Sequence, residues 1–285
     1  MHKNSEVRTT VAYLKWLTDE NRDRRSRVVD ESFHSLYKLA SQVCDVFIIN
    51  NGGIKTDNEF PTINLSKNYY DVAVHFSAYW LAKRKNREFF IYTYDDFVFF
   101  DDNFLESCEK FLDLNTEVSC LRLPHYEYGN SYFNANVTPK SINPDAVRHE
   151  LGAAGADLYF DGPFFTSECS FYKTNWYLNS RPMMWRVKSF EKFLDYLNLE
   201  VVPVMQPFER FLYNTADLLA VDKQFVSSFI DKGVCKTFST KNSERELAQN
   251  GNLRVNWGKI FVNAVELKKE LLSATEYDNG ILYRI

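Results

Sequence analysis

Long apolar runs are absent from this sequence. No stretch approaches the ~20 consecutive apolar residues that cross a bilayer. The first ten residues, MHKNSEVRTT, also contain no apolar core of the kind found in secretory signals. We therefore expect a soluble, cytoplasmic protein with no transmembrane segment. An excess of basic residues is absent too, because the formal net charge is −4, and this argues against a nucleic-acid partner.

The sequence also lacks the usual spacings of zinc and disulfide motifs. It has five Cys and five His, but no C-x-x-C pair and no H-E-x-x-H segment. An odd number of cysteines, most of them in apolar runs, is typical of buried free thiols in a reducing compartment. Aromatic residues, in contrast, are plentiful. The 24 Phe and 17 Tyr are enough to fill a large core and also to line a sugar or base site.

Strands and helices alternate along the first 125 residues. Short apolar runs predict strands at 9–14, 45–49, 62–65, 89–94 and 118–123. Apolar residues at helical spacing predict helices at about 26–43 and 69–85, and another from Asn103 onward. Repeated strand–helix–strand units favour a parallel sheet with right-handed crossovers. We therefore predict an α/β fold, with a Rossmann-like, mainly parallel central sheet flanked by helices.

The second half of the chain is less regular. Residues 126–161 form a long polar segment, followed by a predicted strand at 166–171 and a predicted loop at 179–186. A helix then precedes a short strand at 200–204, and Gln206 opens another helix. From residue 236 the chain is polar before a last helical pattern. We predict one main domain at 1–235 and a C-terminal helical extension at 236–285.

Two adjacent carboxylates, Asp95 and Asp96, end the most apolar strand. Burying such a pair without partners would cost several kcal/mol for each group, so it normally lies at a rim or holds a cation. The carboxyl ends of strands are also where open α/β sheets bind ligands. One interpretation is a site for a divalent metal and a phosphate-bearing substrate. The other is a simple strand end, followed by a helix that Asp101 or Asp102 caps.

In order and spacing, these pieces resemble GT-A glycosyltransferases, most closely those of the family 2 type. The resemblance covers roughly residues 9–219 and rests on three segments. They are VFIINNGG at the end of the second strand, TYDDFVFFDDNFLE around the acidic pair, and QPFERFL at a helix start. The resemblance implies a nucleoside-diphosphate-sugar donor and a glycan, lipid-linked or protein acceptor.

The resemblance also assigns roles to individual residues. Asp96 would bind Mn²⁺ or Mg²⁺, and Asp95 would contact the metal or the ribose. Asn50 would pair with the nucleotide base. Glu209 would be the general base that deprotonates the acceptor hydroxyl, which gives inversion at the anomeric carbon.

Two arginines are candidates for the diphosphate. Arg181 and Arg186 follow one another closely in the predicted 179–186 loop, and guanidinium groups suit bidentate contacts with oxyanions. As surface arginines they would need no function at all.

The sequence departs from the family in ways that keep other functions open. Phe97 stands where the family has a third acidic residue, and Asn50 where it often has Asp. Glu209 has an alternative role as an acidic residue that favours a helix N-terminus. A second hypothesis is therefore a catalytically decayed GT-A-like module that binds nucleotide or carbohydrate. A third, a nucleotidyltransferase, is disfavoured because YLKWLTDENR after the first strand has no glycine for a phosphate loop.

Overall fold

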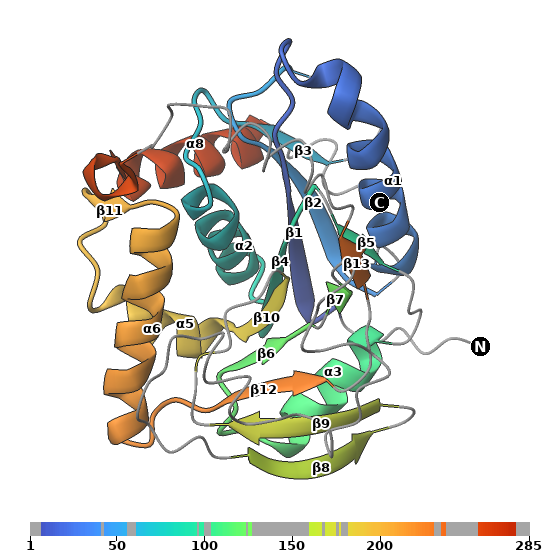
Figure 1. Cartoon of the computed structure of the whole chain (residues 1–285), viewed down its shortest axis with the longest axis vertical. Helices are drawn as coiled ribbons and strands as arrows, with labels where there is room; N and C mark the ends of the chain where they lie inside the picture. The colour runs from blue at the N-terminus through green and yellow to red at the C-terminus, as the bar shows by residue number, and fades with distance from the viewer. Residues whose placement is uncertain are drawn as a thin grey trace.

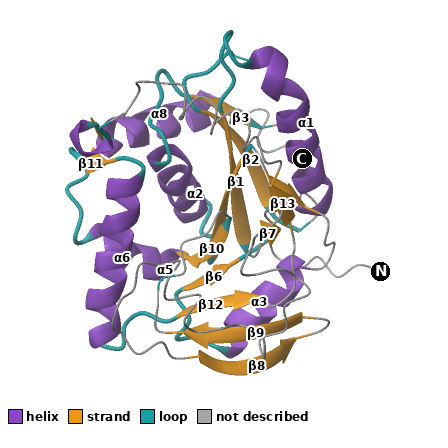
Figure 2. Cartoon of the chain, viewed as in Figure 1, coloured by secondary structure: helices purple, strands orange, loops and turns teal. Residues whose placement is uncertain are grey.

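The structure is a computed structural model that describes residues 7–40, 43–55, 61–95, 97–99, 104–123, 125–126, 160–166, 169–174, 177, 182–230, 235–237 and 256–277. Its α-helices are α1 (Arg22–Ala40), α2 (Val72–Arg84), α3 (Phe104–Leu114), α5 (Val187–Leu194), α6 (Gln206–Val221) and α8 (Ala264–Tyr277). A short 3₁₀-helix, η2, spans Trp257–Lys259. Figure 2 shows the strands in the middle of the molecule with helices along their sides.

The described residues contain one large sheet of nine strands. From one side to the other it runs β3 (Thr62–Asn64), β2 (Asp45–Asn50), β1 (Thr9–Lys15), β4 (Phe89–Tyr94), β10 (Met183–Arg186), β6 (Cys120–Arg122), β12 (Ser227–Ile230), β9 (Cys169–Thr174) and β8 (Phe160–Thr166). Strands β3, β2, β1 and β4 are parallel, and β10 and β9 run against the rest. The predicted α/β fold with a mainly parallel sheet flanked by helices is confirmed.

Helices cover both faces of this sheet and create two buried clusters. Strand β1 is buried along its whole length, as expected for a parallel strand with a helix layer on each side. Its Ala12 and Leu14 face the cluster formed with α2, α5, α6 and α8, whereas Val11 and Tyr13 face the cluster formed with α1 and α3. Figure 1 shows α1 on the opposite side of β1 from α2 and α6.

The two ends of the parallel strands define two edges of the sheet. We call the edge where β1, β2 and β4 end at Lys15, Asn50 and Tyr94 the carboxyl edge, and the edge where these strands begin the amino edge. Along the carboxyl edge Lys15 lies opposite Asn50, and Leu14 lies opposite Tyr94. The residues that follow these strands are therefore neighbours in space although they are far apart in sequence.

Two small sheets complete the described structure. One contains β5 (Phe97–Phe99), β13 (Cys235–Thr237) and β7 (His125–Tyr126) in the order β5-β13-β7. The other pairs β11 (Val202–Pro203) with β14 (Phe261–Val262). Strand β5 packs on α1, where Ser35 Oγ accepts a 2.9 Å hydrogen bond from the Phe99 amide. Asp95 thus lies between the end of β4 in the large sheet and the start of β5.

The part of the predicted C-terminal extension that the structure describes packs on the main domain. Buried Leu267 and Leu271 of α8 join the α2 cluster. Glu270 accepts hydrogen bonds from the Ser66 hydroxyl (2.6 Å) and the Tyr69 hydroxyl (2.7 Å) in the segment before α2. The predicted boundary after residue 235 falls inside β13.

Three sequence predictions in the second half are corrected. The predicted 179–186 loop contains β10, which lies between β4 and β6 in the middle of the large sheet. The single strand predicted at 166–171 is instead two antiparallel strands, β8 and β9. The predictions gave no strand where β12 lies. Strands β10 and β12 pair with strands that are distant in sequence, so local apolar patterns carry little information about them.

Candidate active site

The carboxylate of Asp95 is fixed at the carboxyl edge. Asp95 follows β4 directly and is buried, and its Oδ2 accepts a 3.0 Å hydrogen bond from the main-chain N–H of Trp16. This bond ties the end of β4 to the residue after β1. Asp96, the other member of the acidic pair, lies outside the described residues. Phe97, which stands in the family's third acidic place, is buried against α1 as part of the core.

Asn50 lies at the same edge, at the end of β2. Its side-chain amide donates to the Ile54 carbonyl (2.9 Å) and to Asn64 Oδ1 (2.7 Å), which closes the turn after β2 and holds β3. Its Oδ1 is buried and has no hydrogen-bond partner among the described residues. A Cβ on Gly53 would come within 3.0 Å of this oxygen and 2.4 Å of the Leu17 carbonyl, so only glycine fits there. With the Asn50 side-chain amide oriented in this way, its Oδ1 can accept a hydrogen bond from an N–H group of a ligand.

Asn51 extends the network from β2 to α2. Its main-chain N–H donates to the Lys15 carbonyl (2.9 Å), and its side-chain Oδ1 accepts from the Tyr69 N–H (2.8 Å). Its side-chain amide donates to the Tyr70 carbonyl (3.0 Å). These bonds hold the turn that leads into α2 against the end of β2. The N-terminus of α2 therefore also lies at the carboxyl edge.

Glu209 is connected to the carboxyl edge by hydrogen bonds that join the start of α6 to the start of α2. Asp71, immediately before α2, accepts a 2.8 Å hydrogen bond from the Met205 N–H, and the Met205 carbonyl accepts one of 2.9 Å from the Glu209 N–H. Glu209 thus lies in the first turn of α6, whose start is attached to the start of α2. Burial is the main cause of the raised pKa of the Tyr92 hydroxyl on β4, and the negative charge of Glu209 adds to it.

Two residues at this edge were not predicted from the sequence. Lys15, the last residue of β1, is buried, and burial lowers the pKa of its ammonium although Asp30 and Asp95 oppose that effect. Trp16 follows it and is about 38% exposed, a large aromatic surface beside Asp95. The available signal was a Lys-Trp pair directly after an apolar strand.

Arg186 is not at the carboxyl edge, which corrects its assignment to the same site as Asp95. It lies opposite Phe89 at the start of β4, at the amino edge. Its guanidinium donates to the carbonyls of Leu112, Asn115 and Val118, and burial lowers its pKa. Arg186 therefore holds the loop after α3 in place. The other candidate, Arg181, lies outside the described residues.

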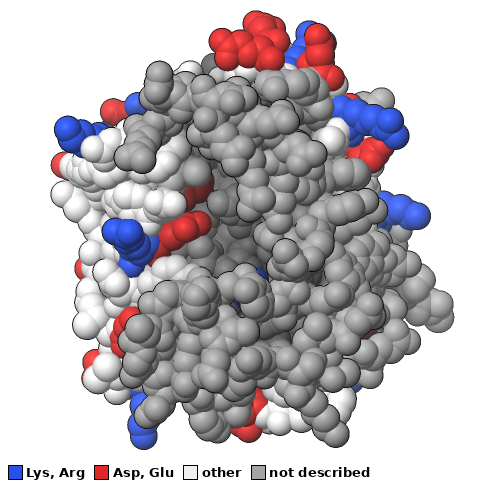
Figure 3. Space-filling model, viewed as in Figure 1, with Lys and Arg blue, Asp and Glu red and all other residues white. Residues whose placement is uncertain are grey.

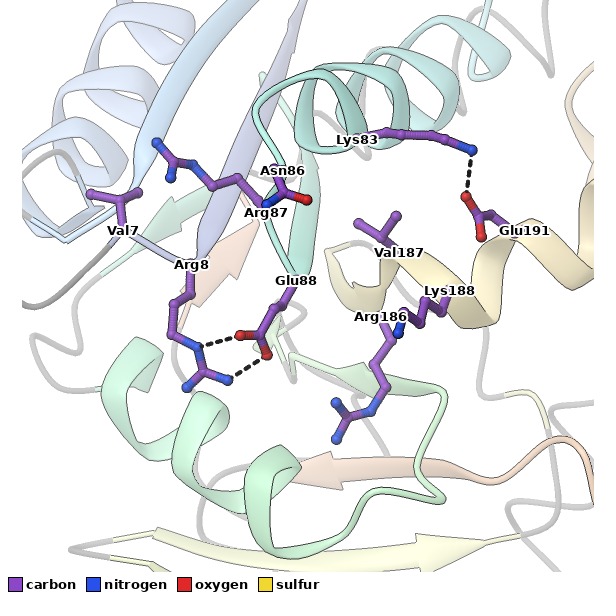
Figure 4. A pocket seen from close by; sticks show the side chains of 10 residues that line it. All are labelled: Val7, Arg8, Lys83, Asn86, Arg87, Glu88, Arg186, Val187, Lys188 and Glu191. Carbon is purple, nitrogen blue, oxygen red and sulfur yellow. Dashed lines mark hydrogen bonds and ion pairs between the residues drawn. The ribbon is translucent and has the colours of Figure 1, made fainter.

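A cavity of about 600 Å³ opens beside Arg186 at the amino edge (Figure 4). Five basic and two acidic side chains of the described residues line it, and both acids form ion pairs. Arg8 binds Glu88 and Lys83 binds Glu191, and each ion pair measures 2.6 Å (Figure 4). The described part of this cavity contains none of the residues that the sequence assigned to the donor except Arg186.

The described residues contain no group of side chains arranged as a metal site. No three His, Cys, Asp or Glu side chains among them come together as a metal site. The donors at the Asp95–Asp96 turn are nonetheless carboxylate oxygens, the ligands that Mg²⁺ and Mn²⁺ prefer. Asp95 therefore offers a ligand of the right chemistry for a hard divalent ion at the carboxyl edge, and Asp96, the next residue in the sequence, is the predicted second ligand.

The described helices and one face of the molecule bear on a membrane or nucleic-acid partner. None of the described helices is long and apolar enough to cross a bilayer. On the face drawn in Figure 3, the Lys and Arg side chains of the described residues are interspersed with Asp and Glu.

Comparisons with known proteins give structural likenesses only. No family model matches the chain, and no curated protein matches it. Among solved structures, S. aureus TarS 1-349 is 12% identical, with 98% of this chain and 75% of that chain covered and a TM-score of 0.49. The chain spans 44% of the longer TarS chain.

Two further structures show the range of these likenesses. Glucosyl-3-phosphoglycerate synthase from Mycobacterium tuberculosis, in complex with Mn²⁺, UDP-glucose and phosphoglyceric acid, is 13% identical, with 95% and 80% covered and a TM-score of 0.44. CMP:2-keto-3-deoxy-manno-octonic acid synthetase complexed with CTP is 9% identical, with 86% and 100% covered and a TM-score of 0.42. At such identities and TM-scores these are likenesses of architecture.

Proposed function

We propose that this protein is a glycosyltransferase. It transfers a sugar from a nucleoside-diphosphate sugar to an acceptor hydroxyl, with inversion and with the help of a divalent metal. The observation that supports this most is the chain of hydrogen bonds along the carboxyl edge. It runs from Asp95 through the end of β1 to Asn51 and the turn before α2, and then from Asp71 to the start of α6. The acidic turn, the base-pairing candidate and the general-base candidate are thereby attached to one framework.

In this proposal the donor nucleotide lies over the ends of β1 and β2. The Oδ1 of Asn50, which has no partner within the described part of the chain, would accept a hydrogen bond from a base N–H. The partly exposed ring of Trp16 would cover the base. The ammonium of Lys15 adds positive charge close to Asp95, where the diphosphate would lie. Arg181 remains a candidate for the same anion.

Asp95 and Asp96 would hold Mn²⁺ or Mg²⁺. The ion supplies electrostatic stabilisation of the leaving diphosphate. The protein's part is to fix the carboxylates, and the bond from the Trp16 N–H to Asp95 does so for the described member of the pair. Glu209 would accept the proton of the acceptor hydroxyl as that oxygen attacks the anomeric carbon. The acceptor, whether glycan, lipid-linked or protein, approaches from the α6 side.

A second candidate function is a GT-A-like binding module without transfer activity. One observation favours it, because Phe97 is a core residue in the place of the third family acid. Such a module would bind a nucleotide or sugar at the same edge and would not hydrolyse or transfer it.

A ligand screen followed by titration tests the proposal. Thermal unfolding with UDP-, GDP-, CMP- and dTDP-sugars identifies the nucleotide, because a ligand of the folded state raises the melting temperature. Calorimetric titration with Mn²⁺, and again with EDTA, then tests the metal. We expect Mn²⁺-dependent binding that Asp96→Asn abolishes while the fold is kept, and slow hydrolysis of the bound donor. Binding that EDTA does not change would remove the metal from the proposal, and binding without any turnover would favour the module.

A further inference from the structure

Asp71 uses its carboxylate in an unusual way for a residue that precedes a helix. An Asp in this position normally caps its own helix by accepting from an N–H of the first turn. Here Asp71 makes no side-chain cap bond to α2, and its backbone is already helical, with φ −66° and ψ −27°. Its Oδ1 instead accepts from the N–H of Met205, 134 residues later, at 2.8 Å. The carboxylate is buried, so this bond is shielded from water.

The residue that Asp71 holds has a strained backbone. Met205 has φ 57° and ψ −134°, a region that residues with a Cβ rarely adopt. Such a conformation persists only where its surroundings impose it. Met205 is the residue before α6, and its carbonyl accepts the N–H of Glu209 at 2.9 Å. Asp71 and Glu209 are thus joined through one residue and two hydrogen bonds.

Ring contacts of His75 also hold the starts of α2 and α6 together across the sheet. The ring of His75, one turn into α2, has its Nδ1 2.8 Å from the Asp71 carbonyl. The centre of this ring lies 3.9 Å from that of Tyr92 on β4 and 5.2 Å from that of Phe208 on α6. Helix α6 therefore has little freedom to slide across the sheet. The position of its first turn along its own axis depends on what holds Met205.

We propose that Asp71 is a positioning residue that sets the place of Glu209 at the carboxyl edge. It does so by holding Met205 in its strained conformation at the start of α6. The functional part of this inference rests on the proposed role of Glu209 as general base. A charged acceptor suits this task, because hydrogen bonds to a carboxylate are shorter and stronger than those to a neutral oxygen.

Kinetics of three single variants test the positioning. The assay is hydrolysis of UDP-glucose, GDP-mannose and dTDP-glucose with Mn²⁺, where water takes the place of the acceptor. Asp71→Ala is expected to lower kcat by roughly tenfold to hundredfold, the scale of a displaced catalytic group, with the donor KM within about twofold. Asp71→Asn keeps an oxygen for the Met205 N–H and should recover most of kcat. Asp222→Ala, at the exposed far end of α6, is the matched control and should have no effect.

A double variant separates positioning from simple stabilisation. Glycine adopts the Met205 conformation without strain, so Met205→Gly should restore the melting temperature of Asp71→Ala. We expect kcat to stay low in the double variant, because the start of α6 is still not anchored. If kcat returns together with stability, Asp71 is only a stabilising residue and the inference is wrong.

Hydrogen exchange makes the test independent of activity. Asp71→Ala should speed exchange of the Glu209 amide, and Asp222→Ala should not. Unchanged exchange at Glu209 would overturn the positioning role. If exchange responds but the wild-type protein hydrolyses no sugar nucleotide, the positioning stands and the proposed transferase function fails.

Discussion

The two edges of the central sheet use their polar residues in different ways. At the amino edge, basic side chains form ion pairs with acidic side chains. Arg8 binds both Glu88 and Asp113 at 2.6 Å, and Arg87 binds Asp45 at 2.9 Å. The Arg8 guanidinium holds the pKa of Asp113 below its usual value. These groups stabilise the folded chain, and few of them remain available to a ligand.

At the carboxyl edge polar side chains bind the main chain instead. Asp95, Asn51 and Asp71 each accept from a backbone N–H that follows a strand or precedes a helix. The same edge keeps features that raise the free energy of the folded state. They are the buried Oδ1 of Asn50, which has no hydrogen-bond partner among the described residues, and the desolvated ammonium of Lys15. Such costs are tolerated at sites built for a ligand. This difference between the two edges supports our proposal that the ligand binds at the carboxyl edge.

The largest expected effect lies at the amino edge. Arg186→Ala would remove the guanidinium donor from the carbonyls of Leu112, Asn115 and Val118, although the first two still accept the N–H groups of Asn115 and Val118. We expect a loss of about 3 kcal/mol in the free energy of unfolding, at roughly 1 kcal/mol for each bond. Urea unfolding measures this loss, with Arg22→Ala on the exposed start of α1 as control. Nucleotide affinity should stay within about twofold. A large loss of affinity in the folded variant would return Arg186 to the donor site and break the comparison.

The next effect concerns catalysis at the carboxyl edge. Glu209→Gln keeps the size of the side chain and removes the base, so transfer or donor hydrolysis should fall by ~10²-fold or more, about 2.7 kcal/mol in activation free energy. Nucleotide affinity should change by a factor of a few at most, because the base acts in the chemical step. Glu200→Gln, an exposed residue outside α6, is the control. Near-normal turnover, or a product that retains the anomeric configuration, would leave Glu209 as a helix N-terminal acid only.

Asn50→Ala should have a smaller effect, on binding. Loss of one buried hydrogen-bonding group costs about 1–2 kcal/mol, which weakens nucleotide affinity by roughly 5- to 30-fold. Calorimetry against Asn214→Ala, which removes an exposed amide on α6, measures the difference. Equal affinity in both variants would show that Asn50 serves the turn after β2 and not the base.

The smallest effect is a gain in stability from Lys15→Met. Burial lowers the pKa of Lys15 in the folded state, so the unfolded chain binds more protons between that value and the unfolded value of 10.5. Stability therefore rises with pH through this window, and below it the folded state carries the cost of the buried charge. Lys15→Met should gain about 1 kcal/mol or less at pH 7 and lose this advantage near pH 10. Thermal unfolding at both pH values tests the sign, and an unchanged difference would show that the charge carries no cost.

The sequence predicted the first half of the fold well for a physical reason. Strands β1, β2 and β4 are continuous apolar runs because helices cover both of their faces, and α2 shows its pattern locally. Strand β10, MMWR, has no such local signal, because it is short and is formed by pairing with β4 and β6. It was therefore predicted as a loop, and the error placed Arg186 at the wrong edge.

The candidate site was predictable only where a strand end carries a conspicuous residue. Asp95 and Asn50 follow apolar runs, and the structure brings them to one edge. Asp71 gave no signal, because its partner Met205 is 134 residues away and only the folded chain brings the two together. The strain at Met205 is equally invisible in a sequence that shows methionine there.

The central claim is that the donor nucleotide binds at the carboxyl edge. Crystals of the wild-type protein soaked separately with Mn²⁺ and UDP, GDP, CDP or dTDP would test it most directly. We predict electron density for one nucleotide with its base beside Asn50 and Trp16 and its diphosphate beside Asp95. Density for the nucleotide in the cavity beside Arg8 and Arg186 at the amino edge would contradict the claim.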